Sequence, residues 1–334
     1  MKKIAFFCNN GPQCPDFNRV FEPRFRARVQ EQSELFSEVV TQANFDIFTS
    51  QMREIEVIFA TWGMWPLSHS QLEAMSNLKA VFYAAGSVKH FAAPLLERGI
   101  VVASAWGANA VPVAEFALAQ ILLANKGYLR NVSEYRMVPG YDRCFRGRGN
   151  YGATVAILGA GHIGRKLIEL LRPFYLRVLV FDPFLSYKAA DILGVEKVET
   201  LEEVFTHSDI VSNHMADLPE TVGMLRGEHF ALMPSNATFI NTGRGLTVNH
   251  DHLVAILLTR PDVTALLDVT DPEPLPLEHP LRTLPNVHIS GHISGSIGDE
   301  VGRLGEVALA EFERWQCGEP LRYAVTSQML ETMA

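Results

Sequence analysis

A short apolar run that leads directly into three spaced glycines constrains this chain more than any other feature. Residues Val155–Leu158 have the composition of a buried strand. They are followed directly by Gly159-Ala160-Gly161-His162-Ile163-Gly164 and then by helical sequence. In such a strand-turn-helix unit the first glycine permits a tight turn, the second lets backbone approach a pyrophosphate, and the third allows close packing of helix on strand. The helix N-terminus then presents N–H groups to the anion. The segment Gly159–Gly164, including His162 and Ile163, is therefore predicted to bind a dinucleotide.

An acidic residue supports a dinucleotide-binding site and indicates which dinucleotide is expected there. Asp182 ends the next predicted strand, 23 positions after Gly159. A carboxylate at this place accepts hydrogen bonds from the hydroxyls of a ribose, and it repels a 2′-phosphate. The expected cofactor is therefore NAD and not NADP.

The alternation of short apolar runs with helical patterns predicts an α/β fold with doubly wound parallel sheets. In the first half the expected strands are residues 4–8, 57–60, 80–84 and 101–104, with helices at residues 33–43 and 90–98. In the second half six strands are expected, at residues 154–158, 178–181, 210–213, 238–241, 264–268 and 287–290. Between the halves, a helix that begins near Asn109 or Ala110 takes Pro112 in its first turn. A long helical pattern at residues 298–315 follows the last strand.

Composition excludes several classes of protein. The formal net charge of −8 argues against a nucleic-acid groove or a basic membrane face, and 48% hydrophobic residues argue against a disordered chain. The four cysteines form no CxxC pair and have no metal-ligand spacing, so neither a disulfide framework nor a metal site is expected. The chain lacks the long apolar run of a signal peptide, and a cytoplasmic location is expected.

Three polar residues in the second half each follow a predicted strand. Arg244 lies in the segment Asn-Thr-Gly-Arg-Gly, whose threonine is Thr242. Glu273 lies five residues after Asp268, and His292 lies in the segment Gly-His-Ile-Ser-Gly. Ligands of parallel sheets bind beyond the carboxyl ends of the strands, so these side chains are expected at one edge. An arginine, a carboxylate and a histidine are the groups that reduction of a 2-oxo acid requires.

These motifs, in this order, resemble the D-isomer-specific 2-hydroxyacid dehydrogenases. The resemblance implies a flavodoxin-like substrate domain, expected at residues 1–110 and 306–334, and a Rossmann NAD-binding domain at residues 111–305. It also implies a homodimer. The chain departs from the family pattern at Gly291, where proline commonly precedes the histidine, and at Met215-Ala216-Asp217 after His214.

The resemblance implies a role for each matching residue. Arg244 would hold the substrate carboxylate and polarise the carbonyl, His292 would exchange a proton with the carbonyl oxygen, and Glu273 would fix the tautomer of His292. Asp268 would contact the nicotinamide side of NAD. The family pattern places His214 near the adenosine and Thr242 beside the cofactor. In the first domain, the segment Gly86-Ser87-Val88 would bind the substrate carboxylate through main-chain N–H groups.

The loop at residues 61–66, Thr-Trp-Gly-Met-Trp-Pro, bears on the choice of substrate. It contains no arginine or lysine that would bind a phosphate, so a small 2-oxo acid of the glyoxylate or hydroxypyruvate type is favoured over phosphoglycerate. Trp62 and Trp65 are either pocket walls or ordinary core residues. Two alternatives stay open: an activity like that of phosphoglycerate dehydrogenase, and a non-enzymatic NAD-sensing protein of the corepressor type.

Overall fold

The computed structural model describes residues 1–137 and 140–332, which form two compact units. The first comprises Met1–Ala110 and the segment from Ser296 onward, and the second comprises Val111–Gly295. The chain returns from the second unit to the first at Ser296, whereas this return was predicted at residue 306. The reason is that Val301, in the 3₁₀ helix η5 (Gly298–Val301), is buried in the core of the first unit.

The first unit contains a five-stranded parallel sheet in the order β2-β1-β3-β4-β5. This is the order of flavodoxin-like sheets, so the predicted fold class is confirmed here. Short apolar runs such as Val-Ile-Phe-Ala in β3 are buried throughout because helices cover both faces. The strands are β1 (Lys2–Phe7), β2 (Ser33–Val40), β3 (Val57–Ala60), β4 (Ala80–Tyr83) and β5 (Val101–Ser104).

Phenylalanines dominate the core on one face of this sheet. Phe6 of β1, Phe59 of β3 and Phe312 of a long C-terminal helix are among them, and the Phe59 and Phe312 rings meet edge to face at 5.3 Å. The helices on this face are α1 (Pro15–Val20), α2 (Pro23–Gln32) and α13 (Gly302–Cys317). The other face is covered by η1 (Phe45–Phe48), α3 (Thr49–Met52), α4 (His69–Ala74), α5 (Ala93–Glu97) and α14 (Ser327–Thr332).

Two predictions for the first half were wrong. The helix expected at residues 33–43 is the strand β2, because pairing with β1, in which Ser33 lies opposite Lys2, outweighs the local helical pattern. The helix expected to begin near Asn109 begins at Trp106 instead. This helix, α6 (Trp106–Asn125), therefore contains Pro112 in its interior and not in its first turn.

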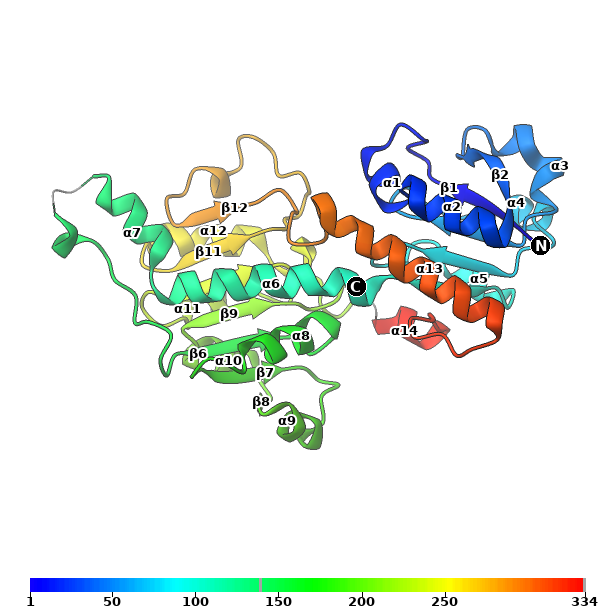
Figure 1. Ribbon diagram of the computed structural model, residues 1–334. Helices are drawn as coiled ribbons and strands as arrows, with labels where there is room; N and C mark the ends of the chain where they lie inside the picture. The colour runs from blue at the N-terminus through cyan, green and yellow to red at the C-terminus, as the bar shows by residue number, and fades with distance from the viewer. Residues whose placement is uncertain (138–139, 333–334) are drawn as a thin grey trace. The chain divides into compact units, whose positions relative to one another are not determined.

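The second unit contains a seven-stranded parallel sheet in the order β12-β11-β10-β9-β6-β7-β8 (Figure 1). The order reverses between β6 and β9, as in Rossmann folds. Six strands were predicted, and the structure adds β8, a three-residue edge strand without a buried side chain. The strands are β6 (Thr154–Leu158), β7 (Arg177–Phe181), β8 (Glu196–Val198), β9 (Ile210–Asn213), β10 (Thr238–Asn241), β11 (Thr264–Leu267) and β12 (Val287–Ile289).

Helices cover both faces of this sheet as well. One face packs against α6, α8 (His162–Leu171) and α9 (Tyr187–Leu193). The other packs against α10 (Leu201–His207), α11 (Gly227–Ala231) and α12 (His250–Thr259). The remaining short elements are α7 (Tyr128–Tyr135), η2 (Tyr141–Arg143), η3 (Gly245–Thr247) and η4 (Pro280–Arg282).

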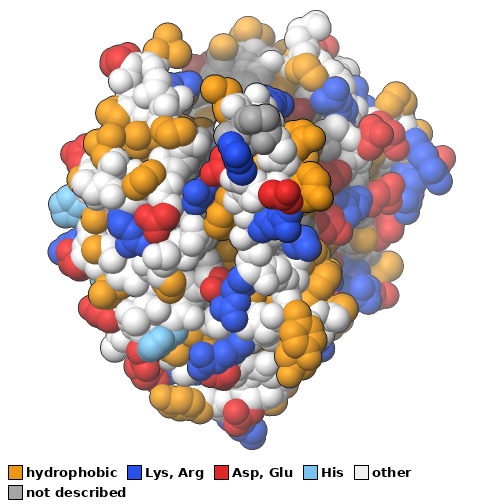
Figure 2. Space-filling view, turned by 90° about the vertical axis from the view of Figure 1, so that its left-hand side faces the viewer, with side chains coloured by type: hydrophobic (Ala, Val, Ile, Leu, Met, Phe, Trp, Pro, Cys, Tyr) orange, Lys and Arg blue, Asp and Glu red, His pale blue; other side chains and the backbone are white. Residues whose placement is uncertain are grey.

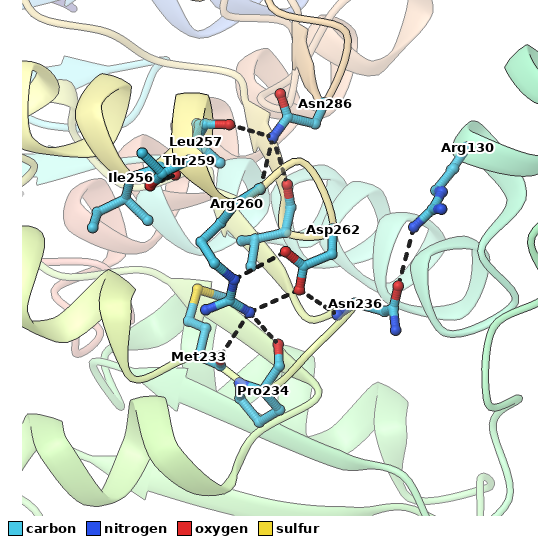
Figure 3. A network of polar contacts seen from close by, with 11 residues as sticks. Arg130, Met233, Pro234, Asn236, Ile256, Leu257, Thr259, Arg260, Asp262 and Asn286 are labelled. Carbon is cyan, nitrogen blue, oxygen red and sulfur yellow. Dashed lines mark hydrogen bonds and ion pairs between the residues drawn. The ribbon is translucent and has the colours of Figure 1, made fainter.

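A polar network holds the loops that enter β10, β11 and β12 (Figure 3). Arg260 binds both carboxylate oxygens of Asp262, at 2.9 and 2.8 Å, and also donates to the Met233 carbonyl at 3.2 Å. The Asn286 amide donates to the carbonyls of Leu257, Arg260 and Val263 at 2.8–3.2 Å. Because these loops lie at the amino ends of the strands, we assign the network to stability and not to ligand binding.

We expect Asn286→Ala to lower the free energy of unfolding by about 1–3 kcal/mol, because it leaves buried carbonyls without a donor. Chemical denaturation of the purified protein measures this. The matched control is Glu278→Ala at an exposed position nearby, for which a change within about 0.5 kcal/mol is expected. Equal effects of the two substitutions would contradict the assignment.

Candidate active site

Candidate residues follow six of the seven strands of the second unit. All the strands are parallel, so these residues lie at one edge of the sheet. Gly159 follows β6, Asp182 follows β7, His214 follows β9, Arg244 comes after β10, Asp268 and Glu273 come after β11, and His292 comes after β12.

Two glycines of the loop, Gly159 and Gly164, pack so closely that no side chain would fit, whereas the space beside Gly161 is open to a ligand. Gly159 has φ +91°, and a Cβ atom there would lie 2.9 Å from the His214 carbonyl oxygen. A Cβ atom on Gly164 would lie 2.1 Å from the Gly159 carbonyl oxygen. A Cβ atom on Gly161, at the N-cap of α8, would meet no atom within 4 Å, and the Gly161 N-cap provides no side-chain cap. His162 and Ile163 form the first turn of α8, so the loop fits a pyrophosphate.

Asp182 lies beside this loop. One carboxylate oxygen accepts the Ala160 N–H at 2.6 Å, and the other accepts the Phe184 N–H at 2.7 Å. Each oxygen keeps further lone pairs that a ribose hydroxyl can use. The carboxylate therefore both fixes the glycine loop and remains able to bind a ribose.

His214 and Thr242, two of the expected cofactor contacts, are buried behind the loop. The His214 ring nitrogens contact the Ser212 hydroxyl at 2.9 Å and the Thr242 hydroxyl at 3.2 Å. Complete burial lowers the pKa of His214 to about 4. His214 is thus a neutral interior residue, and its carbonyl packs against Gly159.

Buried polar side chains at the ends of β9 and β10 fix the backbone of Arg244. The Asn241 amide donates to the Arg244 carbonyl at 3.2 Å, and the Thr247 hydroxyl donates to the same carbonyl at 2.8 Å. Asn213 joins them, since its amide donates to the Asn241 side chain at 3.0 Å and to the Thr247 hydroxyl at 2.8 Å. The loop that carries Arg244 is therefore held by three side chains that are fully or almost fully buried.

The Arg244 guanidinium is partly withdrawn from water. Burial lowers its pKa, and the negative charges of Asp217 and Glu273 act in the opposite direction. A guanidinium stays protonated under these conditions. It donates one hydrogen bond to the Gly243 carbonyl at 2.8 Å, and its planar fork suits a carboxylate.

Asp268 holds the turn that carries His292. Its carboxylate accepts the Ser290 hydroxyl at 2.6 Å and the N–H groups of Ile293 and Ser294, both at 2.9 Å. Its carbonyl accepts the His292 N–H at 3.0 Å. Burial opposes ionisation of Asp268, but these hydrogen bonds outweigh it and lower the pKa of the carboxyl. The observed role of Asp268 is therefore to tie β11 to the histidine turn.

His292 and Glu273 form a hydrogen-bonded pair. His292 Nδ1 lies 2.6 Å from Glu273 Oε1, and both side chains are partly exposed. His292 adopts a left-handed backbone conformation, with φ 56°, which is unusual outside glycine and costs energy that the Asp268 hydrogen bonds offset. With Nδ1 engaged, Nε2 is the nitrogen that is left to exchange a proton with a substrate. A pocket of about 560 Å³ within this unit opens beside the pair.

The expected carboxylate-binding segment of the first unit follows β4. Gly86 and Ser87 are half-buried, whereas Val88 is fully buried in the core. The Ser104 hydroxyl donates to the Gly86 carbonyl, and a Cβ atom on Gly86 would lie 3.2 Å from the Asn109 amide. The Ser104 side chain of β5 thus holds this loop, and the Asn109 side chain of α6 lies close to Gly86.

The residues that support the site were not predicted from the sequence. Asn213 and Asn241 end apolar strands, and an amide at the end of a buried strand is a signal that would have identified them. Thr247, in the 3₁₀ helix η3, and Asp217, in the loop after β9, carried no comparable signal, because neither is the last residue of an apolar strand.

Comparison with known proteins agrees with this geometry. Residues 119–294, more than half of the chain, match the model described as D-isomer specific 2-hydroxyacid dehydrogenase, NAD binding domain. The chain therefore belongs to the D-isomer specific 2-hydroxyacid dehydrogenase family, and the second unit contains its NAD-binding domain.

Relatives with different substrates are found. The chain is 25% identical to D-3-phosphoglycerate dehydrogenase of Methanocaldococcus jannaschii over 84% of this chain and 54% of that protein, so it spans about half the length of this relative. It is 30% identical to glyoxylate reductase of Korarchaeum cryptofilum over 76% of this chain and 78% of that protein. A solved phosphoglycerate oxidoreductase from Rhizobium etli is similar with a TM-score of 0.78, at 25% identity and 97% coverage of each chain.

The low pKa of His214 predicts a pH dependence of stability. Between about pH 6.5 and pH 4 the unfolded chain binds a proton at this residue while the folded chain does not, so stability falls as the pH falls. From pH 7 to pH 4 the wild-type protein should lose about 3 kcal/mol more than His214→Asn. Chemical denaturation across this range measures the difference. Parallel pH profiles for the two proteins would show that His214 is protonated in the folded state.

Proposed function

We propose that the protein is an NAD-dependent oxidoreductase that interconverts a 2-oxo acid and a D-2-hydroxy acid. The observation that carries the proposal is the hydrogen bond between His292 and Glu273, with the Arg244 guanidinium close enough to Glu273 to sense its charge. These three groups lie at the strand edge that also carries the glycine loop.

Arg244 would bind the substrate carboxylate and polarise the carbonyl group that is reduced. Its partial burial favours this, because an arginine with few water contacts gains more from a bound anion. In the first unit, the main-chain N–H groups of Gly86, Ser87 and Val88 would be substrate-binding groups.

His292 would supply the proton. Glu273 would accept a hydrogen bond from Nδ1–H and fix the tautomer of the ring, so that Nε2 can give a proton to the carbonyl oxygen during reduction and recover it during oxidation. Bound NADH would supply the hydride. Asp182 would bind the adenosine ribose, and its charge would disfavour the 2′-phosphate of NADP.

A small substrate without a phosphate group fits the first unit best. The loop after β3, residues 61–66, has no cationic side chain, and the Trp65 ring stacks on Phe7 in the core, with 5.3 Å between the ring centroids. We therefore favour glyoxylate or hydroxypyruvate. Similarity to phosphoglycerate dehydrogenases supports phosphohydroxypyruvate as the second candidate. A non-enzymatic NAD-sensing role would leave the His292–Glu273 pair without a use.

The expected homodimer has support in α6. Among the described residues, this helix alone is long and apolar enough to cross a membrane, yet Ala114, Ala117 and Ile121 are buried in the core of the second unit. Only 33% of its most apolar window is buried within one chain, which leaves apolar surface such as Leu123 for a second copy. Figure 2, which shows the side of the molecule that lies at the left of Figure 1, has exposed hydrophobic side chains among charged side chains of both signs. The thiols are free, which fits a reducing cytoplasm.

If His292 is the general acid, His292→Gln should lower kcat by roughly 10²–10⁴-fold with little change in NADH affinity. The matched control is His288→Gln in β12, four residues earlier, which should retain turnover within a few fold. Steady-state rates with hydroxypyruvate and NADH binding by fluorescence give both numbers. Unchanged kcat in the His292 variant would remove His292 from the mechanism.

If α6 forms the dimer contact, Leu123→Glu should shift the protein from dimer to monomer, because it buries a charge in an apolar interface. Leu258→Glu on α12, which is 62% exposed, is the control and should stay dimeric. Sedimentation equilibrium measures the mass of both. A monomeric wild-type protein would contradict the homodimer.

A further inference from the structure

The chain passes between the two units twice, and one hydrogen bond joins the two passages. The chain leaves the first unit within α6, after Ala110, and it returns at Ser296. The Ser296 N–H donates to the side-chain oxygen of Asn109 at 3.1 Å, although the two residues are 187 positions apart in the sequence. Within the first unit, this bond therefore ties the point where the chain leaves to the point where it returns.

Asn109 also lies against the expected substrate-binding loop of the first unit. Its amide nitrogen would be only 3.2 Å from a Cβ atom on Gly86, so the glycine lets the loop and the side chain approach closely. The Ser104 hydroxyl donates to the Gly86 carbonyl and holds the loop in this place. A single asparagine side chain thus contacts both the loop and the returning segment.

The returning segment is held at both ends by side chains. At one end, the Asp268 carboxylate accepts the N–H groups of the two residues that follow His292. At the other end, Asn109 accepts the N–H of Ser296. Only Gly295 lies between the two held stretches. A shift of Ser296 is therefore passed within a few residues to the turn that carries His292.

We propose that Asn109 is a positioning residue for binding of the 2-oxo acid, an inference that rests on the dehydrogenase activity proposed above. Its side chain keeps the Gly86 loop and Ser296 in one arrangement before the substrate binds. When only a fraction of a protein has the binding-competent arrangement, the apparent affinity for its ligand falls by that fraction. Loss of the tie therefore weakens substrate binding, whereas the bound substrate reacts at close to the normal rate.

Asn109→Ala tests this role, because alanine suits the helix and removes the acceptor. We expect the KM for hydroxypyruvate to rise about three- to tenfold, as for the loss of one hydrogen bond, and kcat to stay within about twofold. NADH affinity should not change, because the predicted cofactor-binding residues lie in the second unit. Steady-state rates and NADH fluorescence measure these quantities.

The matched control is Asn44→Ala, at another half-buried asparagine of the first unit. The Asn44 side chain also accepts a backbone N–H, that of Thr41, at 2.7 Å. Its removal costs stability in the same way, but Asn44 lies outside the two passages, so the KM for hydroxypyruvate should stay as in the wild-type protein.

Hydrogen exchange of the free protein tests the tie without any substrate. Mass spectrometry of overlapping peptides across residues 293–298 should show faster exchange at Ser296 in Asn109→Ala, because the Ser296 N–H has lost its acceptor. Asn109→Asp keeps an acceptor oxygen, so exchange at Ser296 should stay as slow as in the wild-type protein. The aspartate variant also tests the tie if the alanine variant folds poorly.

Unchanged exchange at Ser296 in Asn109→Ala would overturn the tie. A fall in kcat or in NADH affinity as large as the rise in KM would overturn the positioning role, because it would show general damage to the protein. If the wild-type protein reduces no 2-oxo acid, the dehydrogenase proposal and the role in substrate binding both fail, whereas slow exchange at Ser296 that depends on Asn109 would still establish the tie.

Discussion

The site depends on polar side chains that are buried where β9, β10 and β11 end. A buried amide or carboxylate must find hydrogen-bond partners, because leaving one unpaired costs about 1–3 kcal/mol. Asn213 and Asn241 find partners in the loop that carries Arg244, and Asp268 finds them in the turn that carries His292. The requirement to satisfy these groups thus fixes the backbones of the two residues that would act on a substrate.

The same constraint explains why the histidine turn tolerates strain. His292 has a left-handed backbone, and the Asp268 carboxylate holds the two residues that follow it. The turn then directs Nδ1 toward Glu273, which leaves Nε2 for proton transfer. Opposite this edge, Arg260, Asp262 and Asn286 hold the entering loops, so binding and stability are divided between the two ends of one sheet.

Much of this was predictable from the sequence, for physical reasons. The parallel α/β fold follows from short apolar runs, and the glycine loop from its spacing, because both depend on local geometry. The strand β2 was mistaken for a helix since its pairing with β1 is not visible in residues 33–40. The buried partnership of His214 with Thr242 was missed because it joins residues 28 positions apart in the sequence. The order of Arg244, Glu273 and His292 along the chain identified the site, but the residues that position them required the structure.

The most direct test detects the transferred hydride itself by isotope labelling and does not depend on a reaction rate. The purified protein is incubated with hydroxypyruvate and NADH that carries deuterium at both C4 positions of the nicotinamide, and the product is analysed by NMR and on a chiral column. The account predicts D-glycerate with one deuterium at C2. NADH binding without any transfer of deuterium to hydroxypyruvate, glyoxylate or phosphohydroxypyruvate would contradict it and would favour a protein that only senses NAD.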